Sequence, residues 1–302
     1  MFKVQIVMST YNGEEYLARQ VISIMNQRDV CTFLLIRDDG STDHTILEIE
    51  KLQLQYKKRI TYIKGENIGW RKSFMELLYH SGDFDFYGFS DQDDIWMEDK
   101  VITCIKLMLV HGGHEIKLAH CNALSVDKEL RQRKEQEDRV SVPKSHKMAI
   151  TTEYFQGCGM LWNKAAMKLI KKYRPCNDFI AHDYWVGLIC YLFGSVYFTK
   201  DRKFYHIRYD KNSSNDGNVW KGRLTRMNRL VKRQIVYMNP SNDLLIGYAD
   251  CLTQEDRMFL EKIQNYKCNI GSKIDLLIDK EFKRPSFSST VLLKYAILVN
   301  RY

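Results

Sequence analysis

The chain has 302 residues, of which 45% are hydrophobic and 27% are charged, and its formal net charge is +9. This composition excludes a largely disordered chain, and the length allows one large domain or two small ones. No run approaches the ~18 apolar residues of a membrane-spanning helix, while the excess of positive charge favours an anionic partner or surface.

Eight cysteines are present, none of them in a Cys-x-x-Cys pair, and several lie in apolar stretches. This pattern favours the reduced thiols of a cytosolic protein over a disulfide framework or a zinc site. The first residues enter an apolar strand at once, with no signal-peptide pattern. We therefore expect a cytoplasmic protein, whose positive charge also suits peripheral contact with the inner face of a membrane.

Strands and helices alternate over the first hundred residues. Apolar strands are predicted at 2–9, 32–37, 59–64 and 84–90. Helices are predicted between them, at 13–27, after a cap at Ser41 or Thr42, and at 71–79. This alternation indicates an α/β fold with a mostly parallel sheet and helices on both faces.

Polar residues follow three of these strands, at 9–11, 38–39 and 90–93. In an open parallel sheet, ligands bind beyond the carboxyl ends of the strands. Because all three clusters fall at such ends, we expect them to converge on a single site.

The segment after the fourth strand, Asp91-Gln92-Asp93-Asp94, is the most informative part of the chain. Its three carboxylates repel one another and are costly to desolvate. A divalent cation such as Mg²⁺ or Mn²⁺ removes both problems and also binds the diphosphate of a nucleotide. The alternatives are a solvated acidic loop and, for Asp94, the cap of a helix that begins near Trp96.

Three blocks of sequence together resemble the inverting glycosyltransferases of family 2, which have the GT-A fold. The blocks are residues 4–13, 35–43 and 90–96. The last reads Ser-Asp-Gln-Asp-Asp-Ile-Trp and is most similar to the rhamnosyltransferase-like branch. The resemblance implies a GT-A domain at 1–215, with a nucleotide-sugar half at 1–98 and an acceptor half at 99–215. A helical C-terminal region is expected at 216–302.

The resemblance also implies which residues of the first half contact the nucleotide sugar. These are Thr10, Tyr11, Asp38, Asp39, Asn67, Arg71, Asp91 and Gln92. Tyr11 is expected beside the base, and Asp38 is expected to accept the N3–H of uracil or thymine. The alternatives are a turn with a helix cap at Asp38–Asp39 and a solvated basic residue at Arg71.

The metal ligands implied by the resemblance are Asp93, then Asp91, directly or through water, and His206. The family pattern places a histidine three residues before an asparagine, where this chain has Tyr209 before Asn212. His206 lies three residues earlier than that position. Either the loop is shifted and His206 takes the role, or no histidine ligand exists.

In the second half, the resemblance implies nucleotide-sugar contacts at Gly157, Cys158 and His182. Gly157 and Cys158 match a family segment near the sugar pocket, where glycine lets the backbone approach a sugar closely. The segment His182-Asp183 resembles the one that supplies the catalytic base, and Asp183 is expected to take a proton from the acceptor hydroxyl. The alternatives are a plain glycine-containing turn and, for Asp183, the cap of a helix at 184–193.

Residues 219–238 carry six basic side chains and no acidic one, with apolar residues at helical spacing. They predict a basic amphipathic helix that lies either on an anionic membrane or against the catalytic domain. The short apolar stretch at 291–299 suits packing or a homodimer contact.

We therefore expect an inverting, Mn²⁺- or Mg²⁺-dependent transferase that uses a dTDP- or UDP-sugar, with dTDP-L-rhamnose as first choice. The acceptor implied by the resemblance is a glycan, often lipid-linked, in bacterial surface polysaccharide (capsule) synthesis. The alternatives are a UDP-glucose or UDP-galactose hexosyltransferase and an inactive, membrane-attached partner protein. Nucleic acid is not an expected partner, because the basic cluster lies outside the aromatic blocks.

Overall fold

The computed structural model describes residues 1–132, 142–208 and 237–302. The chain forms two compact units. Unit 1 comprises residues 1–142, 155–171 and 182–212, and unit 2 comprises residues 143–154, 172–181 and 213–302. All but the last two residues of the predicted basic helix at 219–238 lie outside the described residues.

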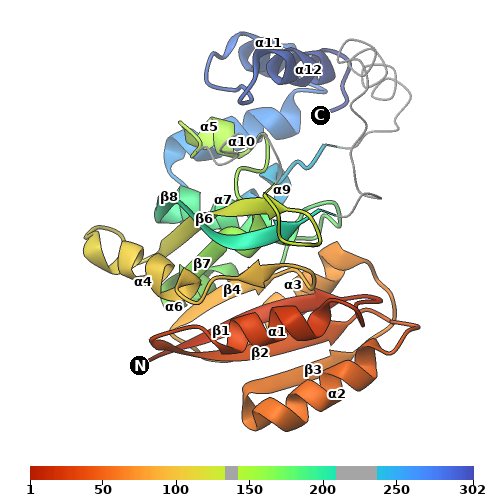
Figure 1. The fold of residues 1–302 in the computed structure, drawn as a ribbon. Helices are drawn as coiled ribbons and strands as arrows, with labels where there is room; N and C mark the ends of the chain where they lie inside the picture. The colour runs from red at the N-terminus through yellow and green to blue at the C-terminus, as the bar shows by residue number, and fades with distance from the viewer. Residues whose placement is uncertain (133–141, 209–236) are drawn as a thin grey trace. The chain divides into compact units, whose positions relative to one another are not determined.

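Four parallel strands form one side of the sheet in unit 1 and confirm the four predicted strands. They are β1 (Phe2–Thr10), β2 (Val30–Asp38), β3 (Ile60–Lys64) and β4 (Phe86–Ser90). β1 lies between β2 and β4 (Figure 1), opposing Thr10 to Asp38 and Met8 to Ser90. The polar clusters that follow β1, β2 and β4 therefore share one edge of the sheet, as predicted.

The other side of the sheet mixes strand directions. β7 (Met160–Asn163) runs antiparallel to β4 and to β6 (Lys117–Val126), and β6 pairs in parallel with β8 (Ser195–Ile207). The two-residue β5 (Ile95–Trp96) pairs with β8. The full order is β3-β2-β1-β4-β7-β6-β8-β5. The mostly parallel sheet is confirmed. β6 matches a strand that the apolar pattern predicts near 118–126, whereas β5, β7 and β8 have no counterpart in the prediction.

Helices and short 3-10 turns connect these strands. The helices are α1 (Leu17–Met25), α2 (Thr45–Tyr56), α3 (Trp70–His80), α4 (Lys100–Val110), α6 (Lys164–Ile170) and α7 (His182–Phe193). The 3-10 turns are η1 (Lys57–Arg59) and η2 (Gly157–Gly159). α1 buries Leu17, Val21 and Ile24 in the core that β1 and β2 line, as its apolar spacing predicts.

Two predicted helix starts are wrong. α1 begins at Leu17, four residues later than expected, because residues 13–16 form a tight turn in which the first carbonyl accepts two backbone hydrogen bonds. α2 begins at Thr45 without a side-chain cap from Ser41 or Thr42. The two loops bind each other instead: Ser41 Oγ accepts a hydrogen bond from Asn12 N (2.9 Å), and Asn12 Oδ1 accepts one from Thr42 N (2.9 Å).

Unit 2 is helical in its described part, which confirms the helical C-terminal region. Its helices are α5 (His146–Ala149), α9 (Ser241–Gly247), α10 (Gln254–Asn265), α11 (Ile270–Ile278) and α12 (Phe287–Leu298). The side chains of Thr253, Asn269 and Ser286 cap the last three of these helices. Among the described helices, none has the length and apolar character needed to cross a membrane.

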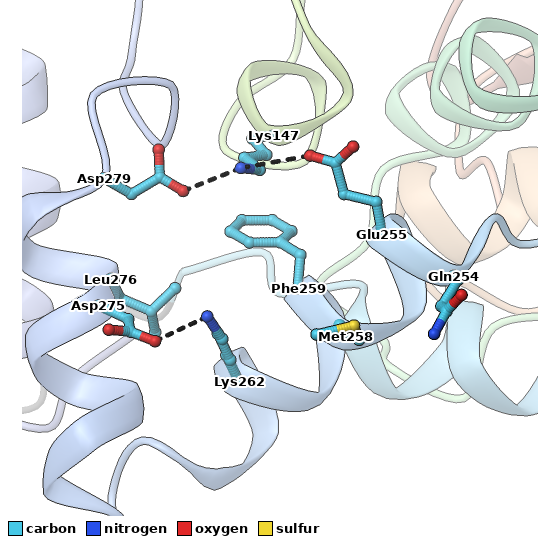
Figure 2. A pocket seen from close by; sticks show the side chains of 9 residues that line it. All are labelled: Lys147, Gln254, Glu255, Met258, Phe259, Lys262, Asp275, Leu276 and Asp279. Carbon is cyan, nitrogen blue, oxygen red and sulfur yellow. Dashed lines mark ion pairs between the residues drawn. The ribbon is translucent and has the colours of Figure 1, made fainter.

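A pocket of about 440 Å³ lies within unit 2, and we call it the C-terminal pocket (Figure 2). It is lined by Lys147, Gln254, Glu255, Met258, Phe259, Lys262, Asp275, Leu276 and Asp279. Lys147 Nζ lies 3.1 Å from Asp279 Oδ2, and Lys262 Nζ lies 2.7 Å from Asp275 Oδ2. The two lysines of the lining are thus paired with acids from the same pocket.

Candidate active site

The acidic segment, residues 91–94, begins directly after β4. Asp91 and Asp93 are partly exposed, whereas Asp94 is buried. Burial, together with the charges of Asp94 and Asp93, raises the pKa of Asp91 to about 7. Burial and the charge of Asp94 likewise raise the pKa of Asp93. The carboxylates thus repel one another, as their spacing predicts.

Asp94 points inward and does not cap a helix, which corrects the alternative raised for it. Its Oδ1 lies 3.0 Å from His206 Nδ1, at the end of β8, and this contact raises the pKa of His206. The residues that follow form β5, and α4 begins only at Lys100, after Asp99. His206 is therefore brought to the acidic segment, through Asp94.

Cys158, in η2, lies beside the same carboxylates. A carboxylate oxygen of Asp91, one of Asp94 and the sulfur of Cys158 all lie within 4.8 Å of one another. No nitrogen or oxygen donor among the described residues reaches Asp94 Oδ2, although that atom is buried. This group is the arrangement, within the described part of the chain, that has the donors to hold a metal ion.

Gln92 ties the end of β4 to the end of β1. Its Oε1 accepts hydrogen bonds from Thr10 Oγ1 (2.5 Å) and Tyr11 N (3.0 Å), and its amide donates to the carbonyl of Tyr11 (3.2 Å). Thr10 is buried by this contact, whereas the Tyr11 side chain is 46% exposed. Of these three predicted nucleotide-sugar contacts, Tyr11 has an exposed ring on which a nucleobase could pack. Thr10 and Gln92 instead hold the two loops together.

Gln20 of α1 is a polar residue of the site that the sequence analysis does not single out. Its fully buried amide is hydrogen-bonded to Ser90 Oγ at 2.6 Å, at the last position of β4. The sequence feature that could have identified Gln20 is its position as a glutamine within the apolar face of a predicted helix. Such a residue needs a buried polar partner, and the strand end before the acidic segment provides it.

The two aspartates at the end of β2 are buried, and each is hydrogen-bonded within the protein. Asp38 accepts hydrogen bonds from the backbone N (3.0 Å) and the hydroxyl of Ser41. Asp39 pairs with the Arg37 guanidinium and accepts hydrogen bonds from Ile68 N (3.0 Å) and Gly69 N (2.9 Å). Asp39 therefore fixes the loop that leads into α3.

The start of α3 presents its polar groups to solvent. Asn67 and Arg71 are exposed, and the Arg71 guanidinium lies 4.3 Å above the Trp70 ring, which is 50% exposed. The Trp70 ring also meets His182 edge-on at 5.8 Å between ring centres. Asn67 and Arg71, two of the predicted nucleotide-sugar contacts, are thus reachable from solvent, and Trp70 places the start of α3 next to the start of α7.

The start of α7 holds His182 and Asp183. The His182 ring stacks on Phe74 at 4.0 Å and meets Phe89 at 4.4 Å, and burial lowers the pKa of His182 to about 4. This histidine is therefore neutral at pH 7. Asp183 is 9% exposed, its Oδ1 accepts a hydrogen bond from Tyr184 N (2.8 Å), and its charge contributes to the raised pKa of Asp91.

The turn η2 packs closely on these residues. A Cβ placed on Gly157 would lie 3.1 Å from His182 Nε2 and 3.5 Å from Asp183 Oδ2. A Cβ on Gly159 would come within 2.7 Å of His120 Nε2, a clash with a fully buried ring. His120, which the sequence analysis does not identify, also lies 3.2 Å from both the N and the O of Gln156. It fixes the turn that carries Cys158.

A family model described as glycosyl transferase family 2 matches residues 5–174. The chain belongs to glycosyl transferase family 2. The matched residues contain the ends of β1, β2 and β4, the acidic segment and η2, while His182, Asp183 and His206 lie beyond them. The family predicted from the three sequence blocks is therefore confirmed.

Two curated relatives of this family 2 protein are informative. The dTDP-rhamnosyl transferase RfbG of Shigella flexneri is 37% identical over 111 residues, which cover 35% of this chain and 38% of RfbG. The UDP-Glc:alpha-D-GlcNAc-diphosphoundecaprenol beta-1,3-glucosyltransferase WfgD of Escherichia coli is 32% identical over 123 residues, covering 38% of this chain and 47% of WfgD. The matches span less than half the length of either relative.

Among solved structures, that of S. aureus TarS in complex with UDP-GlcNAc superposes with a TM-score of 0.55. The sequence identity is 16%, and the superposition covers 92% of this chain and 77% of the TarS chain. At this identity the likeness establishes the fold alone, and it confirms the predicted GT-A architecture.

Proposed function

We propose that this family 2 glycosyltransferase transfers a sugar, with inversion at the anomeric carbon, from a dTDP- or UDP-sugar to a glycan acceptor. The observation that carries the proposal is the convergence, within unit 1, of the acidic segment, η2 and the start of α7. The acidic segment supplies oxygen ligands for a cation, and η2 supplies a backbone that a sugar can approach closely. The start of α7 supplies a carboxylate that can accept a proton.

The nucleotide end of the sugar donor is assigned to the ends of β1 and β2. Tyr11 offers an exposed ring at the end of β1, fit to flank a base. Asp38 is fully buried and both of its carboxylate oxygens accept hydrogen bonds from Ser41, so its proposed role as acceptor of the N3–H of thymine or uracil rests on the family resemblance and requires Ser41 to move aside. Arg71 and Asn67 are exposed beside them and suit the diphosphate.

A divalent cation, proposed to be Mn²⁺ or Mg²⁺, fits the acidic segment. The raised pKa values of Asp91 and Asp93 and the buried Oδ2 of Asp94 without a nitrogen or oxygen donor are what a site lacking its counter-charge exhibits. Asp91 and Asp93 would hold the ion, with Asp94 and His206 behind them. When bound, the cation neutralises charge that develops on the leaving nucleoside diphosphate.

Asp183 is the proposed base. Its Oδ1 is held by Tyr184 N, which leaves Oδ2, on the side of Gly157, for the acceptor hydroxyl. As the acceptor oxygen bonds to the anomeric carbon, the bond from that carbon to the diphosphate breaks, and the hydroxyl proton passes to Asp183. A single in-line displacement needs only this one base and inverts the anomeric carbon.

For the donor sugar, L-rhamnose on dTDP is the first choice, supported by the acidic segment and by the relative named as a dTDP-rhamnosyl transferase. The second choice is UDP-glucose, or UDP-galactose, because the other relative is named as a UDP-Glc-dependent enzyme acting on a diphosphoundecaprenol-linked sugar. That name also supports a lipid-linked acceptor in bacterial surface polysaccharide synthesis. Membrane attachment through 219–238 and dimerisation through 291–299 stay predictions.

The test is a thermal-shift screen of the full chain with dTDP-rhamnose, UDP-glucose, UDP-galactose, UDP-N-acetylglucosamine and GDP-mannose, each with and without Mn²⁺. A ligand of the folded state raises the midpoint, and we expect a Mn²⁺-dependent shift with one thymidine or uridine donor. Asp93→Ala is expected to abolish it, and Asp83→Asn, an exposed carboxylate ahead of β4, is expected to keep it. No shift with any donor would favour the inactive-partner alternative.

A further inference from the structure

The acidic segment of this chain has a neighbour that does not belong among the hard oxygen ligands of Mg²⁺. Cys158 presents its sulfur within 4.8 Å of carboxylate oxygens of both Asp91 and Asp94. Magnesium takes oxygen ligands almost exclusively, whereas zinc and cobalt bind thiolate, imidazole and carboxylate together. The chemistry of this donor set therefore bears on which cation the site accepts.

The buried carboxylate of Asp94 supplies an independent sign of a missing ligand. It is 1% exposed, and its Oδ2 receives no hydrogen bond from a nitrogen or oxygen donor of the described residues. The thiol of Cys158, a weak donor, interacts with this carboxylate. A buried carboxylate oxygen served only by a thiol is costly, and a cation shared by the oxygen and the sulfur would remove that cost.

Cys158 differs from the other buried cysteines of unit 1 in its contact with carboxylates. Its sulfur lies within 4.8 Å of carboxylate oxygens of two aspartates. Cys104 and Cys121 interact chiefly with each other, and burial is what acts on Cys190. Among the cysteines that the structure describes, Cys158 is thus the one placed against two carboxylates.

The sulfur is also held in position. Cys158 lies in η2, between two glycines, and its neighbour Gly159 packs so closely that a Cβ there would lie 2.6 Å from the Cys121 carbonyl oxygen and 2.7 Å from His120 Nε2. Two ligand atoms of a tetrahedral zinc ion lie roughly 3.3 to 3.8 Å apart. Because the three atoms lie within 4.8 Å of one another, each pair needs to close by at most about 1 to 1.5 Å.

We propose that the cation assigned to Asp91 is also held, on its buried side, by Asp94 and by the thiolate of Cys158, and that this site selects a thiophilic divalent ion such as Zn²⁺ or Co²⁺ over Mg²⁺. The thiol proton passes to solvent as the sulfur–metal bond forms. His206, bonded to Asp94 Oδ1, orients that ligand from outside. The inference rests on the proposed function, which assigns a cation to this segment.

The test is titration of the metal-free full chain with Co²⁺, followed by the near-ultraviolet sulfur-to-cobalt charge-transfer absorption. Cys176, Cys251 and Cys268 are exposed and are first replaced by serine, so that their thiols do not contribute. We expect one Co²⁺ per chain with a charge-transfer band. Cys158→Ser is expected to lose the band, and the matched control Cys190→Ser, equally buried in unit 1, is expected to keep it.

Competition titrations test the selectivity. In Cys158→Ser we expect Zn²⁺ affinity to fall at least about tenfold while Mg²⁺ affinity changes less than about twofold. If Cys158→Ser fails to fold, the same Co²⁺ titration of Cys158→Ala, compared with the spectrum of the parent chain, tests whether the charge-transfer band comes from Cys158.

Two outcomes would overturn the thiolate ligand alone: Co²⁺ binding that Asp91→Asn removes but that carries no charge-transfer band, and a band that persists in Cys158→Ser. Binding of Mn²⁺ that depends on Asp91 would then leave the proposed function standing. If neither Mn²⁺, Mg²⁺ nor Co²⁺ binds the chain, the cation of the proposed function is overturned together with its thiolate ligand.

Discussion

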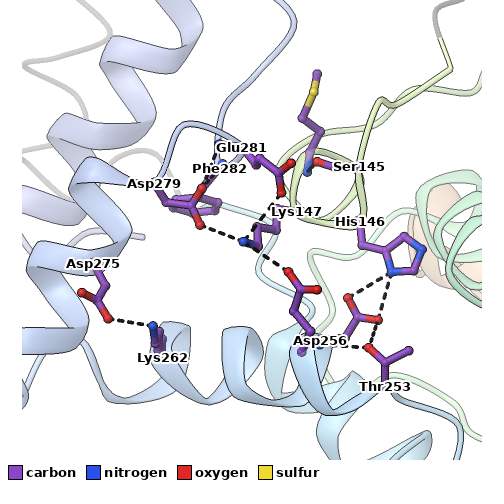
Figure 3. A network of polar contacts seen from close by, with 12 residues as sticks. Ser145, His146, Lys147, Thr253, Asp256, Lys262, Asp275, Asp279, Glu281 and Phe282 are labelled. Carbon is purple, nitrogen blue, oxygen red and sulfur yellow. Dashed lines mark hydrogen bonds and ion pairs between the residues drawn. The ribbon is translucent and has the colours of Figure 1, made fainter.

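The acidic segment of unit 1 and the C-terminal pocket of unit 2 both gather charged side chains, but they balance that charge differently. In unit 2, Lys147 lies within ion-pair distance of Glu255, Asp279 and Glu281, and His146 pairs with Asp256 (Figure 3). In the acidic segment, His206 is the basic side chain that the described residues bring within hydrogen-bond distance of Asp94. Among the described residues, the charges of the pocket therefore balance one another, whereas the carboxylates of the acidic segment chiefly repel one another.

Mutations in the two regions should therefore have opposite effects on the fold. Removing a carboxylate from a self-balanced network should weaken the fold and leave catalysis alone. Removing one from a repelling group should strengthen the fold and weaken catalysis.

Asp183→Asn should lower the turnover rate about 10²- to 10⁴-fold, because an amide cannot take the proton of the acceptor hydroxyl. Donor affinity should stay close to that of the parent, since Asp183 acts on the acceptor side. Initial rates with the donor that the binding screen selects, together with calorimetric donor binding, measure both quantities. Asp201→Asn, an exposed carboxylate of β8, is the control, and equal losses in both variants would contradict the assignment.

Asp91→Asn should lower the Mn²⁺-dependent affinity for the donor about 10- to 100-fold, yet stabilise the metal-free fold. The pKa of Asp91 is raised to about 7 in the folded chain from an ordinary 3.8. The metal-free fold therefore loses stability as pH rises through this window. We expect a gain of about 1–2 kcal/mol in the asparagine variant at pH 8 with EDTA, and almost none at pH 4.

Urea unfolding at the two pH values measures this gain, with Asp83→Asn as the control because its carboxylate is 75% exposed and paired with Lys164. A variant less stable than the parent at pH 8 would show that the acidic segment is internally balanced after all.

Lys147→Met should have the opposite pattern. The lysine side chain is only 20% exposed and serves three carboxylates, so its loss leaves partly buried acids without a counter-charge. We expect unit 2 to lose about 1–2 kcal/mol, with donor affinity unchanged. Urea unfolding of Lys147→Met and of Lys144→Met, an exposed neighbour, provides the comparison. Reduced donor binding in the first variant alone would argue for a ligand role of the C-terminal pocket.

The smallest effect is expected at the His146–Asp256 pair, whose atoms lie 2.9 Å apart. The hydrogen bond to Asp256 raises the pKa of His146 above 6.5, and despite burial the contact with His146 lowers the pKa of Asp256 below 3.8. The stabilisation is therefore complete between about pH 4 and 6.5. It is lost as pH rises through the folded-state pKa of the histidine, and also as pH falls through that of the aspartate.

His146→Gln should accordingly be less stable than the parent by at most ~1 kcal/mol near pH 5.5, and the difference should shrink at pH 8.5. Stability curves at the two pH values measure this. A difference that does not depend on pH would mean that the ring acts through packing rather than through its charge.

The convergence of three polar clusters is the part of the site that sequence reasoning predicts well. It requires only that β1, β2 and β4 are parallel, and apolar runs alternating with helices are enough to indicate that. The observed register, with Thr10 opposite Asp38, confirms it. The family followed from the same three segments because each keeps its chemistry within a few consecutive residues.

The surroundings of Asp94 could not be predicted in this way. Its partners, Cys158 and His206, are 64 and 112 residues further along the chain, and β8, which brings the histidine, alternates too weakly to be recognised as a strand. The same holds for His120, whose contacts are with the loop of Gln156. Local patterns do not encode contacts of this range, because the sheet that creates them forms only in the complete fold.

Gln92 separates the two carboxylates of the Asp-x-Asp pair, and its hydrogen bonds to Thr10 and Tyr11 join the first and fourth strands. A Cβ on Gly13 would lie 2.5 Å from its Oε1, so the two loops are interlocked. The two loops are therefore ordered before a nucleotide sugar binds, and little of the binding free energy is needed to order them. Substitutions at Gln92 should therefore act mainly as an entropic penalty, felt by every nucleotide sugar alike.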